Sequence, residues 1–208
     1  MEADFWHELW DKNETGWHKE ETNEFLLKHF EALQLPKKSR IFIPLCGKSV
    51  DIKWLVEQGY QVVGVELNEP AIKELFEYLQ IEPTITKIGT LLRYSSNNID
   101  IFVGDFFDLN VELLGRVDAI YDRGAIVALP SSMRQEYTKR LISITNKAPQ
   151  LVITFDYDQA LMEGPPFSVD RSLLNRYYID AYTIRLLETI RIKNFGFELD
   201  EHIWLLKA

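Results

Sequence analysis

The sequence has little cysteine and a shortage of positive charge. Cys46 is the one cysteine among 208 residues, so no disulfide can form within the chain and a cysteine-based zinc site would lack ligands. Lysine and arginine number 23 against 32 acidic residues, which gives a formal net charge of -9. This balance argues against nucleic acid as a partner, because binding a polyanion requires an excess of basic side chains.

Long hydrophobic runs are also missing. No stretch reaches the roughly 20 apolar residues of a transmembrane helix. Charges occur throughout the segment from Met1 to Trp17, where a secretory signal would be apolar. We therefore expect a cytoplasmic protein without membrane contact. The length suits one core and no repeat or linker marks a boundary, so we expect a single monomeric domain over residues 1–208.

Two phosphate-binding motifs are absent as well. Gly47, Lys48 and Ser49 match the end of a P-loop, but the glycine that this motif requires at position 42 is Phe42. The G-x-G-x-x-G pattern of dinucleotide enzymes does not occur. A nucleoside-type cofactor of this chain is therefore expected to lack phosphates.

The sequence does contain a regular alternation of apolar runs and helical patterns from residue 41 onward. This alternation is typical of an α/β fold, in which helices cover a parallel sheet. The patterns predict strands at residues 40–45, 61–67, 99–103, 117–121 and 151–155. They predict helices at residues 22–33, 51–57, 70–79 and 131–145, the last capped by Ser131 or Ser132. Residues 81–98 indicate an inserted hairpin, and residues 183–206 an antiparallel pair of strands.

Residues 1–40 precede the first strand and are rich in tryptophan. We expect this segment to form a helical arm over the ligand site, because no linker separates it from the rest. Trp6 and Trp10 are four positions apart, as on one face of a helix. Such a pair can pack an apolar helix face on the core, which we expect for Trp6.

The carboxyl ends of the predicted strands indicate where a ligand binds. Ligands of open parallel sheets bind outside the carboxyl ends of the strands, where residues 44–49 form a turn. Gly47 in this turn lets a ligand approach the backbone. Glu66 lies 19 positions beyond Gly47, near the interval of about 20 at which an acidic residue reaches ribose hydroxyls. A solvent-facing glutamate at a strand end is the alternative.

Two further strand ends carry candidate residues. Asp105 and Phe106 follow the third strand, where a carboxylate and a ring can meet adenine, although Asp105 also suits a simple turn. Asp122 and Arg123 follow the fourth, and charges at a partly buried edge usually have partners or a function. We expect Asp122 to hold the Arg123 guanidinium, either for catalysis or as a structural ion pair.

Several blocks together resemble the thiopurine S-methyltransferase family. They run in order over nearly the whole chain and comprise residues 6–18, 44–49, 63–66, 122–125 and 164–167. The resemblance implies a Rossmann-like methyltransferase fold with a mostly parallel seven-stranded sheet, an antiparallel C-terminal strand and helices on both faces. It also implies transfer of a methyl group from S-adenosylmethionine to the sulfur of a small aromatic or heterocyclic thiol, without a metal.

Site residues are assigned by combining this resemblance with the strand-end argument. Catalysis is assigned to Arg123 and Asp122. The acceptor is expected beside Trp17 and the stiff loop of Pro165, Pro166 and Phe167. The residues expected to bind the cofactor are Trp10, Leu45, Gly47, Glu66, Asp105, Phe106 and Arg123.

Other interpretations stay open at this point. A methyltransferase of similar sequence can act on halide, thiocyanate, selenium or tellurium species, and a non-catalytic protein can bind an adenosyl ligand as a sensor. Cys46 is expected to be a small buried residue rather than a nucleophile. The four histidines show no metal-ligand spacing.

Overall fold

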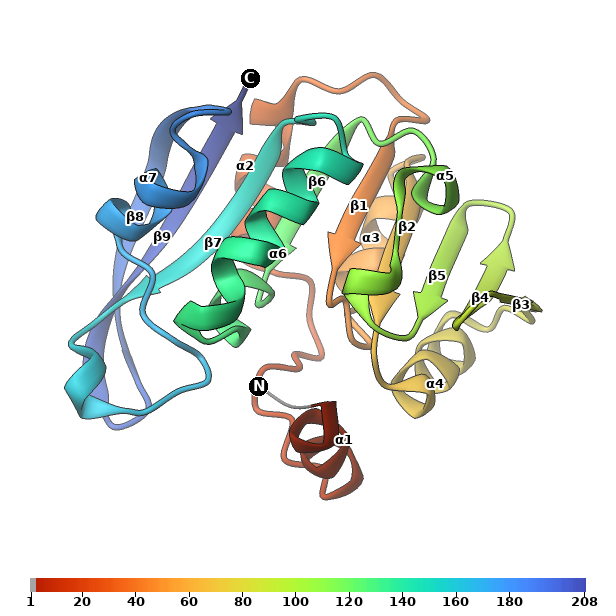
Figure 1. The fold of residues 1–208 in the computed structure, drawn as a ribbon, viewed down its shortest axis with the longest axis horizontal. Helices are drawn as coiled ribbons and strands as arrows, with labels where there is room; N and C mark the ends of the chain where they lie inside the picture. The colour runs from red at the N-terminus through yellow and green to blue at the C-terminus, as the bar shows by residue number, and fades with distance from the viewer. Residues whose placement is uncertain (1–2) are drawn as a thin grey trace.

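One mixed sheet organises residues 3–208, which are the part of the chain that the computed structural model describes (Figure 1). Its nine strands are β1 (Arg40–Pro44), β2 (Gln61–Glu66), β3 (Thr84–Ile88), β4 (Leu91–Ser96), β5 (Ile99–Val103), β6 (Ala119–Arg123), β7 (Gln150–Asp156), β8 (Thr183–Asn194) and β9 (Phe197–Lys207). They lie in the order β3-β4-β5-β2-β1-β6-β7-β9-β8. The order reverses beside β1, because β2 and β6 both pair with it in parallel.

Helices cover both faces of this sheet. They are α1 (Ala3–Asp11), α2 (Glu24–His29), α3 (Asp51–Glu57), α4 (Glu69–Leu79), α5 (Val111–Leu114), α6 (Ser131–Ile144) and α7 (Arg171–Tyr178), with 3₁₀ turns at Phe30–Leu33, Phe106–Asp108, Ile126–Ala128 and Gln159–Leu161. Leu26, Leu55 and Leu75 from α2, α3 and α4 bury one face. Leu141 and Leu174 from α6 and α7 bury the other.

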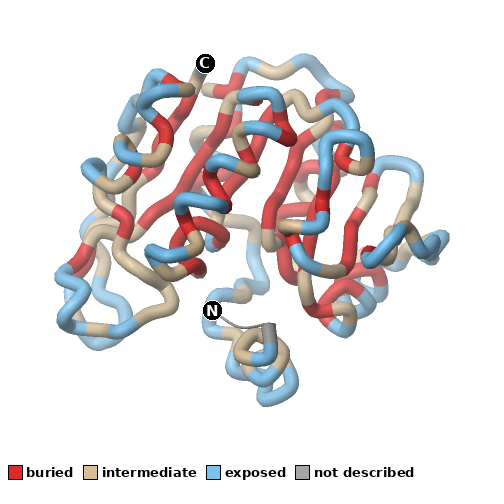
Figure 2. Tube along the Cα trace, viewed as in Figure 1, coloured by how far each residue is buried: buried red, intermediate tan, exposed pale blue. Residues whose placement is uncertain are grey.

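The burial pattern explains why these residues form these elements. The five parallel strands at the centre are covered on both sides, which requires the continuous apolar runs seen in the sequence. Buried residues are accordingly concentrated along the central strands, whereas α1 is partly exposed (Figure 2). Asn23 and Asn68 begin α2 and α4 by accepting hydrogen bonds from free backbone N–H groups of the first turn.

The structure corrects the strand count of seven. The pair β3 and β4 is the predicted hairpin, but β4 also pairs antiparallel with β5 over residues 92–96. The hairpin therefore extends the sheet, and β9 and β8 extend its other edge antiparallel to β7. Backbone pairing with the buried strand β5 stabilises a hairpin that would be only marginally stable alone.

Two helix boundaries also differ from the prediction. The helix expected over residues 22–33 consists of α2 followed by a 3₁₀ turn that ends at Gln34, whose φ of 57° stops the helix. Helix α6 begins after Pro130 and has no side-chain cap, so the predicted caps Ser131 and Ser132 are wrong. Pro130 is the N-cap residue, whose backbone carbonyl accepts the Met133 N–H at 2.9 Å but whose side chain offers no hydrogen-bond acceptor.

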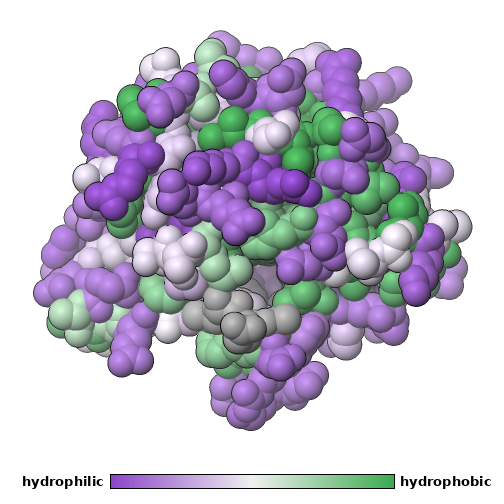
Figure 3. Space-filling view, in the orientation of Figure 1, coloured by the Kyte–Doolittle hydropathy of each residue, from purple (hydrophilic) through white to green (hydrophobic). Residues whose placement is uncertain are grey.

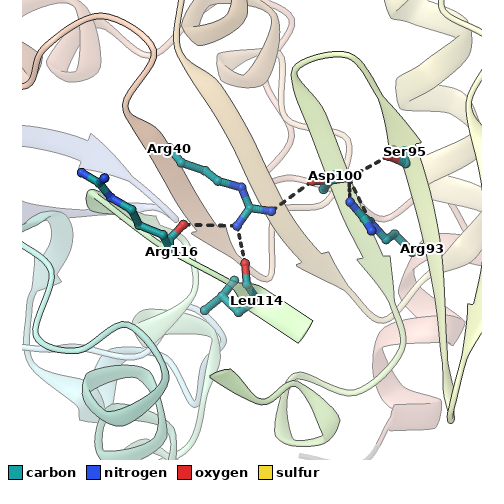
Figure 4. A network of polar contacts seen from close by, with 6 residues as sticks. All are labelled: Arg40, Arg93, Ser95, Asp100, Leu114 and Arg116. Atoms are coloured by element: carbon teal, nitrogen blue, oxygen red, sulfur yellow. Dashed lines mark hydrogen bonds and ion pairs between the residues drawn. The ribbon is translucent and has the colours of Figure 1, made fainter. Parts of the chain in front are cut away.

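A polar network closes the sheet at the amino ends of the strands (Figure 4). The Arg40 guanidinium donates to the Asp100 carboxylate at 3.0 Å and to the backbone carbonyl oxygens of Leu114 and Arg116. Burial alone would raise the pKa of Asp100, but hydrogen bonds from Ser95, Arg93 and Arg40 outweigh it and lower the pKa. The network joins β1 to β5, so this end of the sheet is structural.

Among residues 3–208, no helix combines the length and the apolarity that crossing a bilayer requires.

We predict that Gly64→Ala destabilises the fold. An added Cβ would lie 2.8 Å from Cys46 Sγ and 2.9 Å from Ile101 Cδ1, and both neighbours are buried. Such overpacking lowers the free energy of unfolding by about 1–3 kcal/mol. Urea unfolding measures the change. Gly16→Ala is the control, because nothing lies within 4 Å of its added carbon. Equal stabilities of the two variants would contradict the packing argument.

Candidate active site

The turn at residues 44–49 leaves β1 in an uncommon conformation. Leu45 and Gly47 both have left-handed backbone angles, with φ of 47° and 52°. A non-glycine residue in this region is strained and persists only where its surroundings hold it, which is frequent at functional sites. The turn is held by Cys46, whose N–H donates to the Val65 carbonyl at 3.0 Å. The turn is therefore fixed at the carboxyl ends of β1 and β2.

Glu66 connects this turn to the next one. The residue is 6% exposed, and its carboxylate accepts the Gly47 N–H at 2.8 Å and the Asn68 N–H at 2.9 Å. Burial raises the pKa of Glu66, and the backbone hydrogen bonds oppose this shift. Each carboxylate oxygen can accept a further hydrogen bond, so the group can also bind a hydroxyl. The alternative of a solvent-facing glutamate is wrong.

Cys46 lies beneath the turn and is buried, as the sequence indicated. Burial raises the pKa of its thiol well above the ordinary value, and the neighbouring Glu66 carboxylate raises it further. A thiol that stays protonated is a poor nucleophile. Cys46 is therefore a packing residue.

A cavity of about 1070 Å³ opens at the carboxyl ends of the strands, beside this turn. The space-filling view is hollowed between α1 and the strand ends (Figure 3). Most of the residues predicted for the site line it, namely Trp10, Trp17, Leu45, Gly47, Glu66, Asp105, Phe106, Arg123, Pro165 and Pro166. Asp122 and Phe167 are not among the lining residues.

Three tryptophans of the N-terminal arm meet over one side of the cavity. The Trp17 ring packs edge-on against Trp6 at 5.5 Å and against Trp10 at 5.6 Å, measured between ring centroids. Trp10 also covers Gly47, where an added Cβ would lie 3.3 Å from the indole. The expectation that Trp6 packs on the core is wrong, because it is half-buried and lines the cavity.

Asp122 and Arg123 do not form the expected pair. Neighbouring residues of a strand point to opposite faces of the sheet. Asp122 is fully buried on the α6 face, where its carboxylate accepts the Tyr137 hydroxyl at 2.7 Å and the Ile126 N–H at 3.1 Å. Arg123 points to the opposite face and lines the cavity.

The carboxylate beside Arg123 is Asp51, which sequence reasoning missed. Asp51 Oδ2 lies 3.7 Å from Arg123 Nη1 and accepts the Tyr121 hydroxyl at 3.1 Å. Asp51 Oδ1 accepts the Asn23 N–H at 2.8 Å. The fully buried Asp51 thus joins the start of α2 to the end of β6 and orients Arg123. Its position in the first turn of α3, directly after the turn at residues 44–49, was an available but weak signal.

Residues of the loops after β5 and β7 differ in whether they line the cavity. Asp105 accepts the Phe107 N–H at 2.9 Å, so the turn role considered for it is present. Phe106 is 3% exposed and its ring packs against Tyr137 at 4.9 Å, at the border of the cavity. Phe167 packs under Gly164, where an added Cβ would lie 2.6 Å from its ring. It supports the loop that carries Pro165 and Pro166 rather than lining the cavity.

Comparison with known proteins identifies the family. The sequence model described as thiopurine S-methyltransferase matches residues 1–199. The chain belongs to the thiopurine S-methyltransferase family. A thiopurine S-methyltransferase of Teredinibacter turnerae is 50% identical over 188 residues, which cover 90% of this chain and 87% of that protein. One of Xanthobacter autotrophicus is 43% identical over 212 residues, which cover 100% and 99%.

Solved structures show the same fold at low sequence identity. A methyltransferase of Anabaena variabilis that depends on S-adenosylmethionine has a TM-score of 0.68 at 14% identity, covering 99% of this chain and 95% of that one. A Burkholderia thailandensis 1,6-didemethyltoxoflavin-N1-methyltransferase, solved with S-adenosylhomocysteine, has a TM-score of 0.61 at 15% identity, with 99% and 87% covered. The predicted family and the methyltransferase fold are thereby confirmed.

We predict that the buried Asp122 makes the stability of this family member depend on pH. Burial raises the pKa of Asp122 from 3.8 to about 6, against the effect of its hydrogen bonds. An acid with a raised folded-state pKa stabilises the fold below the unfolded value and loses that contribution as pH rises through the folded one. Between pH 4 and pH 7 this loss amounts to at most about 3 kcal/mol.

Asp122→Asn should remove this part of the pH dependence. Urea unfolding at both pH values measures it, with the exposed Asp180→Asn as control. If Asp122→Asn and the wild type lose equal free energies of unfolding between pH 4 and pH 7, the carboxyl does not titrate as stated.

Proposed function

We propose that this chain transfers the methyl group of S-adenosylmethionine to the sulfur of an aromatic or heterocyclic thiol. One observation supports this most. The turn with Leu45, Gly47 and Glu66 and the residues around Arg123 line a single cavity, at the edge of the sheet where the order of strands reverses. The relatives in this family are named for S-methylation of thiopurines, which supports a thiol as the acceptor.

The cofactor half of the site is proposed to extend from the turn to the loop after β5. Glu66 suits ribose hydroxyls because it is an anchored carboxylate with hydrogen-bond capacity left. The turn at Leu45 and Gly47, which lines the cavity, suits the amino-acid part of the cofactor. Phe106 and Asp105 suit adenine, and Trp10 offers a ring face to the sulfonium. The residues present thus fit S-adenosylmethionine.

The acceptor half is proposed to lie between Trp17 and the Pro165–Pro166 loop, with Arg123 between the two halves. The cofactor supplies a methyl group on a positively charged sulfur, and its transfer is an in-line displacement. The chain's task is to hold the acceptor sulfur in line and to exclude water. The Arg123 guanidinium favours a thiolate over a thiol, and Asp51 keeps that guanidinium in place.

No strong general base is required when the acceptor is a simple aryl thiol. An aromatic thiol is more acidic than an alkyl thiol and is substantially ionised near neutral pH. Asp122 is then a positioning residue. Its carboxylate accepts hydrogen bonds from the Tyr137 hydroxyl and the Ile126 N–H, and so fixes the end of β6 from the face of the sheet opposite Arg123. Arg123 is the residue of the pair that faces the acceptor.

We further propose a monomeric, cytoplasmic protein with one domain over residues 1–208. The two helical layers share a single sheet, which supports one domain. The single cysteine is buried and needs no oxidising compartment.

Methylation assays test the proposed function. The purified protein is incubated with S-adenosylmethionine carrying a labelled methyl group and with thiophenol, 6-mercaptopurine, iodide or thiocyanate. We expect S-methylated products from the two aromatic thiols. Methylation of the inorganic anions alone would favour the detoxifying alternative. Calorimetric binding of S-adenosylhomocysteine without turnover of any acceptor would favour a sensor.

We predict that Glu66→Gln weakens binding of S-adenosylhomocysteine by about tenfold or more. The amide cannot accept hydrogen bonds at both of its ends, so a backbone N–H loses its partner and the hydroxyls lose a charged acceptor. Calorimetry measures the dissociation constant. Glu77→Gln on the exposed face of α4 serves as control and should bind like the wild type. Equal affinities of all three proteins would exclude Glu66 from the cofactor site.

A further inference from the structure

A carboxyl group without a partner lies in the acceptor half of the cavity. Glu201 on β9 lines the cavity. Within residues 3–208 its carboxylate has no hydrogen bond or ion pair. Other acids of the same strand behave differently, because Asp200 and Glu198 both pair with Arg191, at 3.0 Å and 3.5 Å. Glu201 is therefore left with free acceptor capacity inside the site.

The surroundings of Glu201 make this arrangement unfavourable for the protein alone. Burial raises the pKa of Glu201, and the positive charge of Arg123 opposes that shift. The Glu24 carboxylate on α2 raises the pKa further, whereas Lys19 in the preceding loop lowers it. A partly buried carboxylate without a hydrogen-bond partner destabilises a fold, and such groups are concentrated at functional sites.

The strand register places Glu201 across the acceptor half from Arg123. Arg123 on β6 pairs with Ile153 on β7, and Phe155, two residues further on β7, pairs with Glu201 on β9. Residues 123, 153, 155 and 201 share one face of the sheet by this register. The Cα atoms of Arg123 and Glu201 are thus separated by roughly 10 Å across the strands and roughly 7 Å along them.

Both of these side chains are long and line the same cavity. A cation and an anion therefore lie on one face of the sheet beside the same cavity, and Phe155 lies between them in the strand register. A ring placed there presents its sulfur toward Arg123 and a ring N–H toward Glu201.

We propose that Glu201 is a specificity-determining residue that accepts a hydrogen bond from a ring N–H of the acceptor, and so selects heterocyclic thiols over simple aryl thiols. This inference rests on the proposed S-methyltransferase function and names the acceptor class within it. An N–H donor satisfies the carboxylate, whereas a hydrocarbon ring leaves it desolvated and unpaired.

The chemistry of such acceptors gives the carboxylate a further effect on the rate. A heterocyclic thiol with nitrogen beside the sulfur-bearing carbon carries its proton on nitrogen and has a C=S bond. During transfer the sulfur forms a bond to the methyl carbon, and the bond from that carbon to the sulfonium sulfur breaks with its electron pair left on that sulfur. The C=S bond becomes C–S, the N–H electron pair forms C=N, and the proton passes to the Glu201 carboxylate.

The hydrogen bond to Glu201 therefore strengthens as positive charge develops on the ring nitrogen. An interaction that is stronger in the transition state than in the bound substrate raises kcat as well as affinity.

Two acceptors of nearly equal size test the inference. Pyridine-2-thione has a ring N–H beside its sulfur, and thiophenol has a C–H in that place. We expect Glu201→Leu to lower the ratio of kcat/KM for pyridine-2-thione to that for thiophenol about tenfold or more. Glu201→Gln should lower this ratio less, because the amide oxygen still accepts the N–H without a charge. Glu198→Gln, an exposed change on the same strand, should leave the ratio as in the wild type.

The dependence on pH provides a second readout. The charged carboxylate is the stronger acceptor, so the advantage of the wild type over Glu201→Gln for pyridine-2-thione should grow as pH rises and Glu201 ionises. Comparing the two proteins at each pH removes the ionisation of the thiols themselves. Binding of S-adenosylhomocysteine by each variant shows that it is folded, and Glu201→Gln decides the outcome if Glu201→Leu does not fold.

The possible failures are distinguishable. A wild type that methylates neither thiol overturns the proposed function and this inference with it. A wild type that methylates both, with an unchanged ratio in the Glu201 variants, overturns only the role of Glu201. An equal loss for both thiols would likewise overturn it and assign Glu201 to the support of Arg123.

Discussion

The site depends on the carboxylate of Glu66, which closes two chain turns at once. By accepting the N–H groups of Gly47 and Asn68, it joins the ends of β1 and β2, where Leu45 holds a strained backbone. These hydrogen bonds are charge-assisted and buried, so they are strong enough to hold that conformation. Gly64 lies beneath Cys46, and its lack of a side chain leaves space for the Cys46 side chain of the turn. The cofactor half is thus prepared by backbone geometry before any ligand contacts it.

Much of this arrangement could be predicted from local sequence patterns. The range of α3 was predicted as Asp51–Glu57, and the strands around β1, β2 and β5 within about two residues. Buried parallel strands read as continuous apolar runs, and helices between them are marked by Gly, Asn and Pro. The spacing of Glu66 from Gly47 follows from the length of one strand–helix–strand unit. These features depend on residues that are close together in the chain, so a single sequence is enough to predict them.

Long-range partners could not be predicted in this way. Asp122 and Arg123 are adjacent in sequence, and adjacency suggested a pair, but the alternation of a strand separates them. The true partner of Arg123 is Asp51, which is distant in the chain and is brought near by the pairing of β1 with β6. Phe167 was assigned to the cavity from its neighbours, although it packs behind them. The pairing of β4 with β5 likewise could not be predicted from local sequence patterns.

The aromatic arm gives the two halves of the cavity a common wall. Trp10 rests on Gly47 of the cofactor turn and also against Trp17, whose carbonyl oxygen accepts a hydrogen bond from Arg123 on the acceptor side. A shift of one indole therefore changes the surroundings of both ligands. In thermodynamic terms any coupling through this wall is reciprocal, so that each ligand alters the binding of the other by the same factor. Titrating one ligand in the presence of the other measures this coupling across the wall of three rings.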